Sequence, residues 1–340
     1  MKTIIQYIAF LLPFCLSWSP EAQGQVVPRY GAYLINGTLF NPAYTGYREF
    51  LYANTLYHRQ WMTQESSPGF FALLIDGSIS DVVNLGFQAT SEHLGLARQT
   101  SASASYAYRV QLSRTSDISL GLSLGAMYSG VNQGRLKAVA PEDPAILELS
   151  GKAIPHISAG LYFGSRIFYG GIALRNLSGK SREDLAGGYL LAPPSQNVAV
   201  TFGTFIPVTS KVIFRPSLMW QDDFETASSM DVTAACIFID RFWLGVSIRT
   251  DQPFGRKPAP DASANAYYSA ALLGEVFITD RITMSYAYDV GLASFSSAYL
   301  GGHQVSLGYY ITQHKNTPYN YKYRFKSHYK SNICPNCIKR

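Results

Sequence analysis

Hydrophobic residues alternate with small or polar residues along most of this chain. In residues 119–128, leucine, alanine and tyrosine take every second position, and serine and glycine take most of the positions between. Residues 196–206 and 282–290 alternate in the same way. Because neighbouring residues of a β-strand point to opposite faces, each segment predicts a strand with one apolar face and one small or polar face. A helix would scatter the same residues around its circumference.

We count fourteen alternating segments, whose boundaries the pattern fixes only to within a few residues. They are 50–62, 68–78, 82–92, 98–112, 117–131, 154–165, 166–177, 196–207, 211–222, 228–239, 241–251, 264–279, 280–291 and 303–312. Most of them are long enough to cross a membrane, which takes a β-strand about 9–11 residues. A soluble β-sandwich is the alternative fold, but its strands are usually shorter.

The connections between these segments are of two kinds. The tight connections are 79–81, 113–116, 164–165, 207–210, 239–240 and 279–280. The long connections are 132–153, 178–195, 252–263 and 292–302. Tight and longer connections alternate from the second segment onward, which is typical of outer-membrane barrels with short periplasmic turns and long external loops. The sequence therefore predicts an all-β fold, a transmembrane antiparallel β-barrel of about fourteen strands, with both termini in the periplasm.

Composition supports a membrane barrel over a soluble protein. The chain is 47% hydrophobic and only 15% charged, whereas soluble domains carry about 25% charged residues. Low charge without long apolar runs is typical of alternating membrane strands, because half of each strand faces lipid. Aromatic residues near strand ends predict girdles at the two membrane interfaces. These residues are Tyr106, Tyr108, Trp220, Phe242, Trp243, Tyr286 and Tyr288.

The first residues predict a secretory signal. Lys2 precedes an apolar stretch over 4–18, and small residues at 22–24 suit cleavage before Gln25. An uncleaved anchor is the alternative, but the stretch is short for a span of about 20 residues. We therefore divide the chain into a signal peptide (1–24), an N-terminal periplasmic or plug segment (25–46), the barrel (47–312) and a basic periplasmic tail (313–340).

The positive charge of the chain is concentrated in that tail. The formal net charge is +6, and the residues after Ile311 include seven Lys or Arg and no Asp or Glu. A cationic arm on a nearly neutral barrel is a poor indication of nucleic-acid binding and a better one of an acidic protein partner. The predicted partner-binding residues are Lys322, Arg324, Lys326 and Lys330.

Two cysteines close the tail, in the sequence Cys334-Pro-Asn-Cys337. Such a pair can be a catalytic dithiol, half of a zinc site or a local disulfide. A redox enzyme would place the pair at a helix start after a strand, so we favour a disulfide, or an adduct with a partner in an oxidising periplasm. Cys236 lies in the middle of a predicted strand and is expected to be buried or lipid-facing.

Residues that resemble catalytic groups lack a catalytic setting. Ser123 lies in a Gly-x-Ser-x-Gly sequence, but that motif needs a sharp strand-to-helix turn, and here it falls within an alternating strand. Asp76, His93, Asp289 and His303 could be combined into a hydrolase site, yet nothing in their spacing selects it. His58 and His156 likewise show no metal-ligand spacing. We expect no enzymatic activity, no metal and no cofactor.

Four charged residues interrupt otherwise apolar strands. They are Arg215, Arg249, Glu275 and Asp289. A charge on the lipid face costs roughly 2–4 kcal/mol at the bilayer midplane. We therefore expect these side chains to point into the lumen and to form pairs there.

Several motifs occur in a recognisable order. Asn-Pro-Ala-Tyr-Thr-Gly (41–46) precedes the first strand, Tyr-His-Arg-Gln-Trp (57–61) and Ser-Pro (67–68) follow, and Ser-Tyr-Ala-Tyr (105–108) and Leu-Gly-Leu-Ser-Leu-Gly-Ala (120–126) come later. In this order, from about residue 30 to 311, the chain resembles the PorP/SprF family of Bacteroidetes outer-membrane proteins, which is tied to type IX secretion and gliding motility. Thr45 stands where the family usually has alanine. The residues that carry the resemblance are Asn41, Pro42, Ala43, Tyr44, Gly46, Arg59, Gln60 and Trp61.

The resemblance implies a barrel without enzymatic activity that anchors or delivers a secreted surface protein and docks periplasmic secretion subunits. The implied partners are a secreted surface adhesin or other type IX cargo, type IX subunits of the periplasm and outer membrane, and the lipid bilayer. An outer-membrane channel similar to fatty-acid transporters is the alternative. Pro42 and Gly46 predict a turn, which either folds inward as a plug or starts the barrel.

Overall fold

The computed structural model describes residues 33–48, 50–60, 67–95, 97–113, 115–131, 152–178, 196–209, 211–223, 228–238, 242–252, 267–292 and 301–311. Two short 3-10 helices come first, η2 (Gly37–Leu39) and η3 (Pro42–Tyr44). The strands follow in the order β1 (Tyr52–Gln60), β2 (Gly69–Ser78), β3 (Val83–Leu94), β4 (Ala97–Ser113), β5 (Ser116–Val131), β6 (Lys152–Ser165), β7 (Phe168–Arg175), β8 (Asn197–Thr204), β9 (Ile206–Pro207), β10 (Val212–Asp222), β11 (Ser228–Phe238), β12 (Phe242–Gln252), β13 (Tyr267–Phe277), β14 (Ile282–Gly291) and β15 (Gly302–Tyr310).

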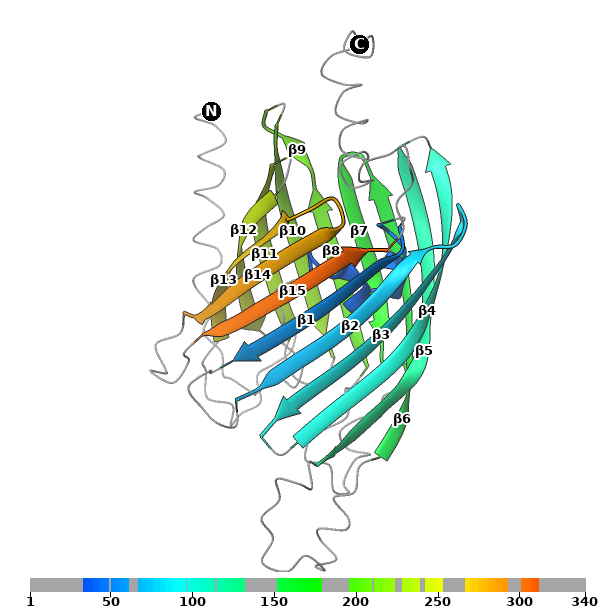
Figure 1. The fold of residues 1–340 in the computed structure, drawn as a ribbon, viewed down its shortest axis with the longest axis vertical. Coiled ribbons are helices and arrows are strands. Elements are labelled where there is room, and N and C mark those ends of the chain that lie inside the picture. The colour runs from blue at the N-terminus through cyan, green and yellow to red at the C-terminus, as the bar shows by residue number, and fades with distance from the viewer. Residues whose placement is uncertain are drawn as a thin grey trace, which may run out of the picture.

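The strands form one closed antiparallel sheet, a barrel (Figure 1). Successive strands pair with each other, and β15 returns to pair with β1. β8 and β9 both pair with β10 in a single register, with Gly203 opposite Ser217 and Ile206 opposite Phe214. They are therefore two parts of one strand, and the barrel has 14 strands. The predicted fold class is confirmed.

The two ends of the barrel differ. Tyr52 at the start of β1 lies opposite Tyr310 at the end of β15, so the barrel begins and finishes at one end, uppermost in Figure 1. The connections at this end are short, and we call it the tight-turn end; the opposite end, where β5 is joined to β6, is the loop end. One loop-end connection is shorter than the alternation predicts, because Gly95, with φ +60°, lets β3 turn directly into β4.

The outer face is apolar, as the alternation predicts. Leu120, Leu122 and Leu124 of β5 are exposed, whereas Ser119 and Ser123 point inward and are buried. Of the predicted girdle residues, Tyr106, Tyr108, Phe242, Tyr286 and Tyr288 are exposed. Trp243 is wrongly predicted: it is 3% exposed and packs in the lumen. Phe242, Trp243 and Leu244 form an unbroken apolar run, so alternation could not assign their faces.

The lumen contains an apolar core. Side chains of the N-terminal residues, including Leu34, Leu39 and Phe40, pack in one cluster with inward side chains of the wall. The wall contributes Leu56, Phe70, Ala72, Leu74, Ile213, Met219, Ala235, Ile237, Trp243, Ala271, Leu273 and Ala287. Within the described ranges, no helix has the length and apolar character needed to cross a membrane.

Candidate functional site

The candidate site is formed by residues 33–48, which we call the interior segment, and the barrel wall that holds them. Figure 1 shows this segment in dark blue inside the barrel. Its turn is specified locally: Asn41 caps η3, because its side-chain oxygen accepts a hydrogen bond from the Ala43 amide at 2.9 Å, and Pro42 occupies the first helical position. Gly46, with φ +67°, then reverses the chain in a conformation that suits glycine.

The wall of β5, β6 and β7 provides a close-fitting seat for this turn. The Asn41 side-chain amide donates to the carbonyls of Leu161 (3.0 Å) and Ile172 (3.4 Å). A Cβ atom on Gly121 would overlap the backbone of Pro42 and Ala43, and one on Gly160 would overlap the Asn41 side chain. We call the turn's contact surface with these glycines the glycine seat.

A second set of contacts holds the turn against β2, β3 and β4. The Gly46 amide donates to Asp76 Oδ2 at 2.8 Å, and the Ser78 hydroxyl donates to the Gly46 carbonyl at 3.2 Å. Arg109 Nη2 lies 3.5 Å from the Thr45 carbonyl. The turn is therefore hydrogen-bonded to inward groups on both sides of the glycine seat.

Aromatic rings fill the space beside the turn. Tyr44 stacks on Tyr47 with centroids 4.9 Å apart, and both rings meet the edge of Tyr162, at 5.2 and 5.0 Å. The Arg109 guanidinium lies 5.1 Å from the Tyr47 ring, in cation–π range. Burial raises the pKa of the Tyr44 phenol, so its hydroxyl stays protonated at neutral pH.

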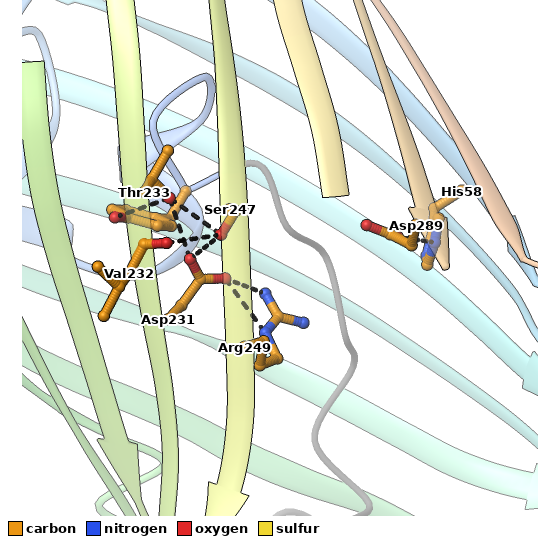
Figure 2. Close-up of polar contacts among 8 residues, drawn as sticks. His58, Asp231, Val232, Thr233, Ser247, Arg249 and Asp289 are labelled. Carbon is orange, nitrogen blue, oxygen red and sulfur yellow. Dashed lines mark hydrogen bonds and ion pairs between the residues drawn. The ribbon is translucent and has the colours of Figure 1, made fainter. Parts of the chain in front are cut away.

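The beginning of the interior segment is bonded to a different part of the wall. The Tyr33 hydroxyl donates to Thr233 Oγ1 at 3.3 Å. Figure 2 shows the network behind it: Thr233 and Ser247 donate to Asp231, which also forms an ion pair with Arg249 at 2.8 Å. Tyr33 therefore contacts a group of polar side chains within an otherwise apolar part of the lumen.

The end of the interior segment folds back on its beginning. The Arg48 guanidinium donates to the Ile35 carbonyl and lies 4.1 Å from the centroid of the Tyr52 ring. The segment is thus fastened at its start, its turn and its end, and β1 begins directly after it.

The family-motif residues divide between this site and the loop end. Residues 41–46 form the turn in the glycine seat, whereas Arg59 lies near the end of β1, where its Nε donates to Ser67 Oγ at 2.9 Å. Gln60 ends β1. Trp61 and the tail residues Lys322, Arg324, Lys326, Lys330, Cys334 and Cys337 lie outside the described residues.

The charged strand residues point into the lumen, as predicted. Arg249 pairs with Asp231, and Asp289 pairs with His58 at 3.2 Å (Figure 2). Arg215 donates to the Tyr169 hydroxyl at 2.9 Å, and Glu275 is buried. Asp231 and Tyr169, the partners of Arg249 and Arg215, are lumen residues that the sequence did not single out.

The residues considered for a hydrolase site are not brought together. Asp76 binds the Gly46 amide, Asp289 binds His58, and His303 Nδ1 lies 2.7 Å from the Tyr286 hydroxyl. Ser123 lies within β5 and not at a strand-to-helix turn. Across the described part of the chain, no three His, Cys, Asp or Glu residues are grouped to hold a metal ion. Cys236 is half-buried among the outward positions of β11.

Sequence reasoning missed the seat itself. It treated Gly121 only as one of the small residues on the inward face and did not single out Gly160 or Arg109. Glycines at inward positions of neighbouring strands were the available signal, since a glycine in a strand marks close approach by another backbone.

A membrane channel of solved structure has a similar fold. A "TodX deltaS2S3 mutant monoaromatic hydrocarbon channel" aligns with 10% identity and a TM-score of 0.50, over 85% of this chain and 94% of the other. A Pseudomonas aeruginosa FadL homologue aligns with 11% identity and a TM-score of 0.46, over 86% and 96%. At such identities the likeness shows the fold alone.

The sequence comparison is more specific. No curated protein matches the chain. Residues 22–309 match the model of the family described as type IX secretion system membrane protein PorP/SprF. The chain therefore belongs to the PorP/SprF family of type IX secretion system membrane proteins, and it has the fold of an outer-membrane β-barrel.

Proposed function

We propose that this protein is a plugged, non-enzymatic platform of the type IX secretion system in the outer membrane. It anchors or delivers a secreted surface protein, such as an adhesin, and docks periplasmic secretion subunits. The observation that carries the proposal is the interior segment, which is fastened to opposite sides of the wall through Asn41, Gly46 and Tyr33. A lumen filled in this way supports a fixed scaffold better than a passage.

The two ends of the barrel take different roles in this proposal. The tight-turn end faces the periplasm, so both termini lie there, and the chain is cleaved before Gln25. Connections at the loop end, such as 132–151 and 179–195, face outward and hold the secreted partner. Short turns on the periplasmic side and long loops outside are the usual arrangement of outer-membrane barrels.

The basic tail is the proposed periplasmic contact. Its seven cations, including Lys322, Arg324, Lys326 and Lys330, would attract an acidic surface on a secretion subunit. This attraction would weaken as salt is raised, because exposed charges are screened beyond about 10 Å at 0.1 M. A disulfide between Cys334 and Cys337 would close the end of the tail.

Crosslinking in native membranes tests the docking role. Partners of the full-length barrel would be identified by mass spectrometry and compared with those of a variant lacking residues 315–340. We expect periplasmic secretion subunits to be lost from the truncated barrel and the secreted partner to remain. A second variant has Lys322, Arg324, Lys326 and Lys330 changed to Gln. It tests whether docking needs the positive charge of the tail or only its length. An unchanged set of periplasmic partners in both variants would refute docking through the tail.

The redox state of the tail is measured separately. Peptides released from the native protein without reductant should show Cys334 and Cys337 joined, with a mass about 2 Da below that of the dithiol form. Two free thiols in protein taken directly from native outer membranes would contradict the proposed disulfide.

A further inference from the structure

Two of three turns at the tight-turn end share one backbone construction. In 208–212 the Val212 carbonyl accepts hydrogen bonds from the amides of Val208 (3.0 Å) and Thr209 (3.1 Å). In 278–282 the Ile282 carbonyl accepts from the amides of Ile278 (2.9 Å) and Thr279 (3.3 Å). The third turn, 165–168, joins β6 to β7.

Each of these turns is also closed by a side-chain hydroxyl. Thr209 Oγ1 accepts from the Val212 amide at 3.1 Å, and Thr279 Oγ1 accepts from the Ile282 amide at 3.0 Å. In the third turn, Ser165 Oγ accepts from the Phe168 amide at 3.1 Å. Such hydroxyl-capped turns hold the backbone in a fixed shape, so the residues that they present have a defined position.

Every one of these turns presents a large apolar side chain. Ile167 and Val208 are each 62% exposed, and Ile278 is 51% exposed. Val208 lies in line with the outward residues Phe202 and Ile206 of the strand before it. Ile278 lies in line with the outward residues Leu272 and Val276 in the same way. These apolar side chains therefore extend the lipid-facing surface to the edge of the barrel.

A basic residue accompanies each apolar residue. Arg166 is next to Ile167, while Lys211 and Arg281 each follow three positions after Val208 and Ile278. Lys211 and Arg281 are exposed. Asp280 lies in the turn 278–282, and it has a partner of its own. The β2–β3 turn, which has the same backbone hydrogen bonds, carries Ile79 and Asp81 but no cation.

We propose that these three turns, which we call the rim, bind the headgroups of an anionic phospholipid leaflet. Ile167, Val208 and Ile278 enter the boundary between acyl chains and headgroups, and the exposed Lys211 and Arg281 contact the phosphates. The apolar side chains of the rim are continuous with the lipid-facing surface, which favours a lipid over a protein as the ligand. The basic side chains favour an anionic headgroup. Interfacial positions favour such pairs of apolar and basic side chains. The inference rests on the barrel crossing a membrane and does not depend on the role in secretion.

Lipid binding to the full-length, detergent-solubilised barrel tests this inference. Native mass spectrometry would measure the dissociation constants of phosphatidylglycerol and phosphatidylcholine for the wild type and for K211Q/R281Q. Each cation removed should weaken phosphatidylglycerol binding about fivefold, and phosphatidylcholine binding should stay unchanged. Arg166 is kept, because it makes further contacts within the protein.

The matched control neutralises one Arg and one Lys of strand ends at the loop end, as R98Q/K152Q, and should bind both lipids as the wild type does. Unchanged phosphatidylglycerol affinity in K211Q/R281Q, or an equal loss in the control, would overturn the inference. If K211Q/R281Q kept its lipid affinity and lost a crosslinked periplasmic protein, the rim would be a protein contact, and the inference would again be wrong. None of these results bears on whether the lumen is plugged, which is measured by conductance.

Discussion

At the scale of single residues, fit and hydrogen bonding in the lumen decide how the interior segment is held. Gly160 faces the Asn41 side chain so closely that an added Cβ would overlap it, and Asp76 accepts the Gly46 amide at 2.8 Å. Overpacking a well-filled interior typically costs 1–3 kcal/mol, and leaving a buried amide without an acceptor costs a similar amount. Both positions are therefore sensitive to the smallest substitutions.

A Gly160→Ala substitution should lower the free energy of unfolding by about 1–3 kcal/mol, because the new methyl group displaces Asn41. Urea unfolding of the barrel in phospholipid vesicles would measure it. Gly170→Ala is the control, since a Cβ there meets its nearest atom, the Thr201 carbonyl oxygen, at 3.2 Å and no part of the interior segment. Equal stability of Gly160→Ala and Gly170→Ala would show that the glycine seat is not tightly packed.

Asp76→Ala should destabilise the barrel by about 1–3 kcal/mol, since the Gly46 amide loses its acceptor. Asp76→Asn keeps an acceptor oxygen and should recover much of that loss in the same unfolding measurement. If Asn were as harmful as Ala, the contribution of Asp76 would come from its charge and not from this hydrogen bond.

At the scale of elements, the strands could be predicted from the sequence, and a plug was one of two alternatives for the N-terminal segment, but the contacts that hold this segment could not be predicted. In β5, alternation assigns Leu120 and Ser123 to opposite faces. The apolar face of a membrane-barrel strand must face lipid, so Leu120 is assigned to the outside and Ser123 to the lumen. It failed at Trp243, where three apolar residues follow one another. The glycine seat joins Asn41 to Gly160 and Ile172, which are more than a hundred positions away. Alternation predicts which face of the barrel wall a residue occupies. It does not predict the position along the barrel axis at which two inward residues meet.

The polar network on β11 and β12 should behave as one unit. Arg249→Met leaves Asp231 buried without its ion-pair partner and should cost about 3–5 kcal/mol of unfolding free energy. The double variant R249M/D231N removes both charges and should be more stable than R249M alone. A double variant as unstable as R249M would mean that Arg249 contributes through its packing and not through the ion pair.

At the scale of the whole molecule, three features support the proposed membrane scaffold: a lipid-facing outer surface, a segment of the chain packed inside the lumen, and short turns gathered at one end. Membership of the type IX secretion family assigns the molecule to a secretion machine. The fold is shared with channels, but a shared fold does not establish a shared function. Whether the lumen conducts is therefore the property that would distinguish the proposed platform from a pore.

Planar-bilayer conductance of the purified full-length protein tests this central claim most directly. We predict no steady current above the bare bilayer, whereas a variant lacking residues 33–48, shown by its unfolding transition to be folded, should conduct. Steady open-channel currents from the full-length protein would contradict the account and favour a channel.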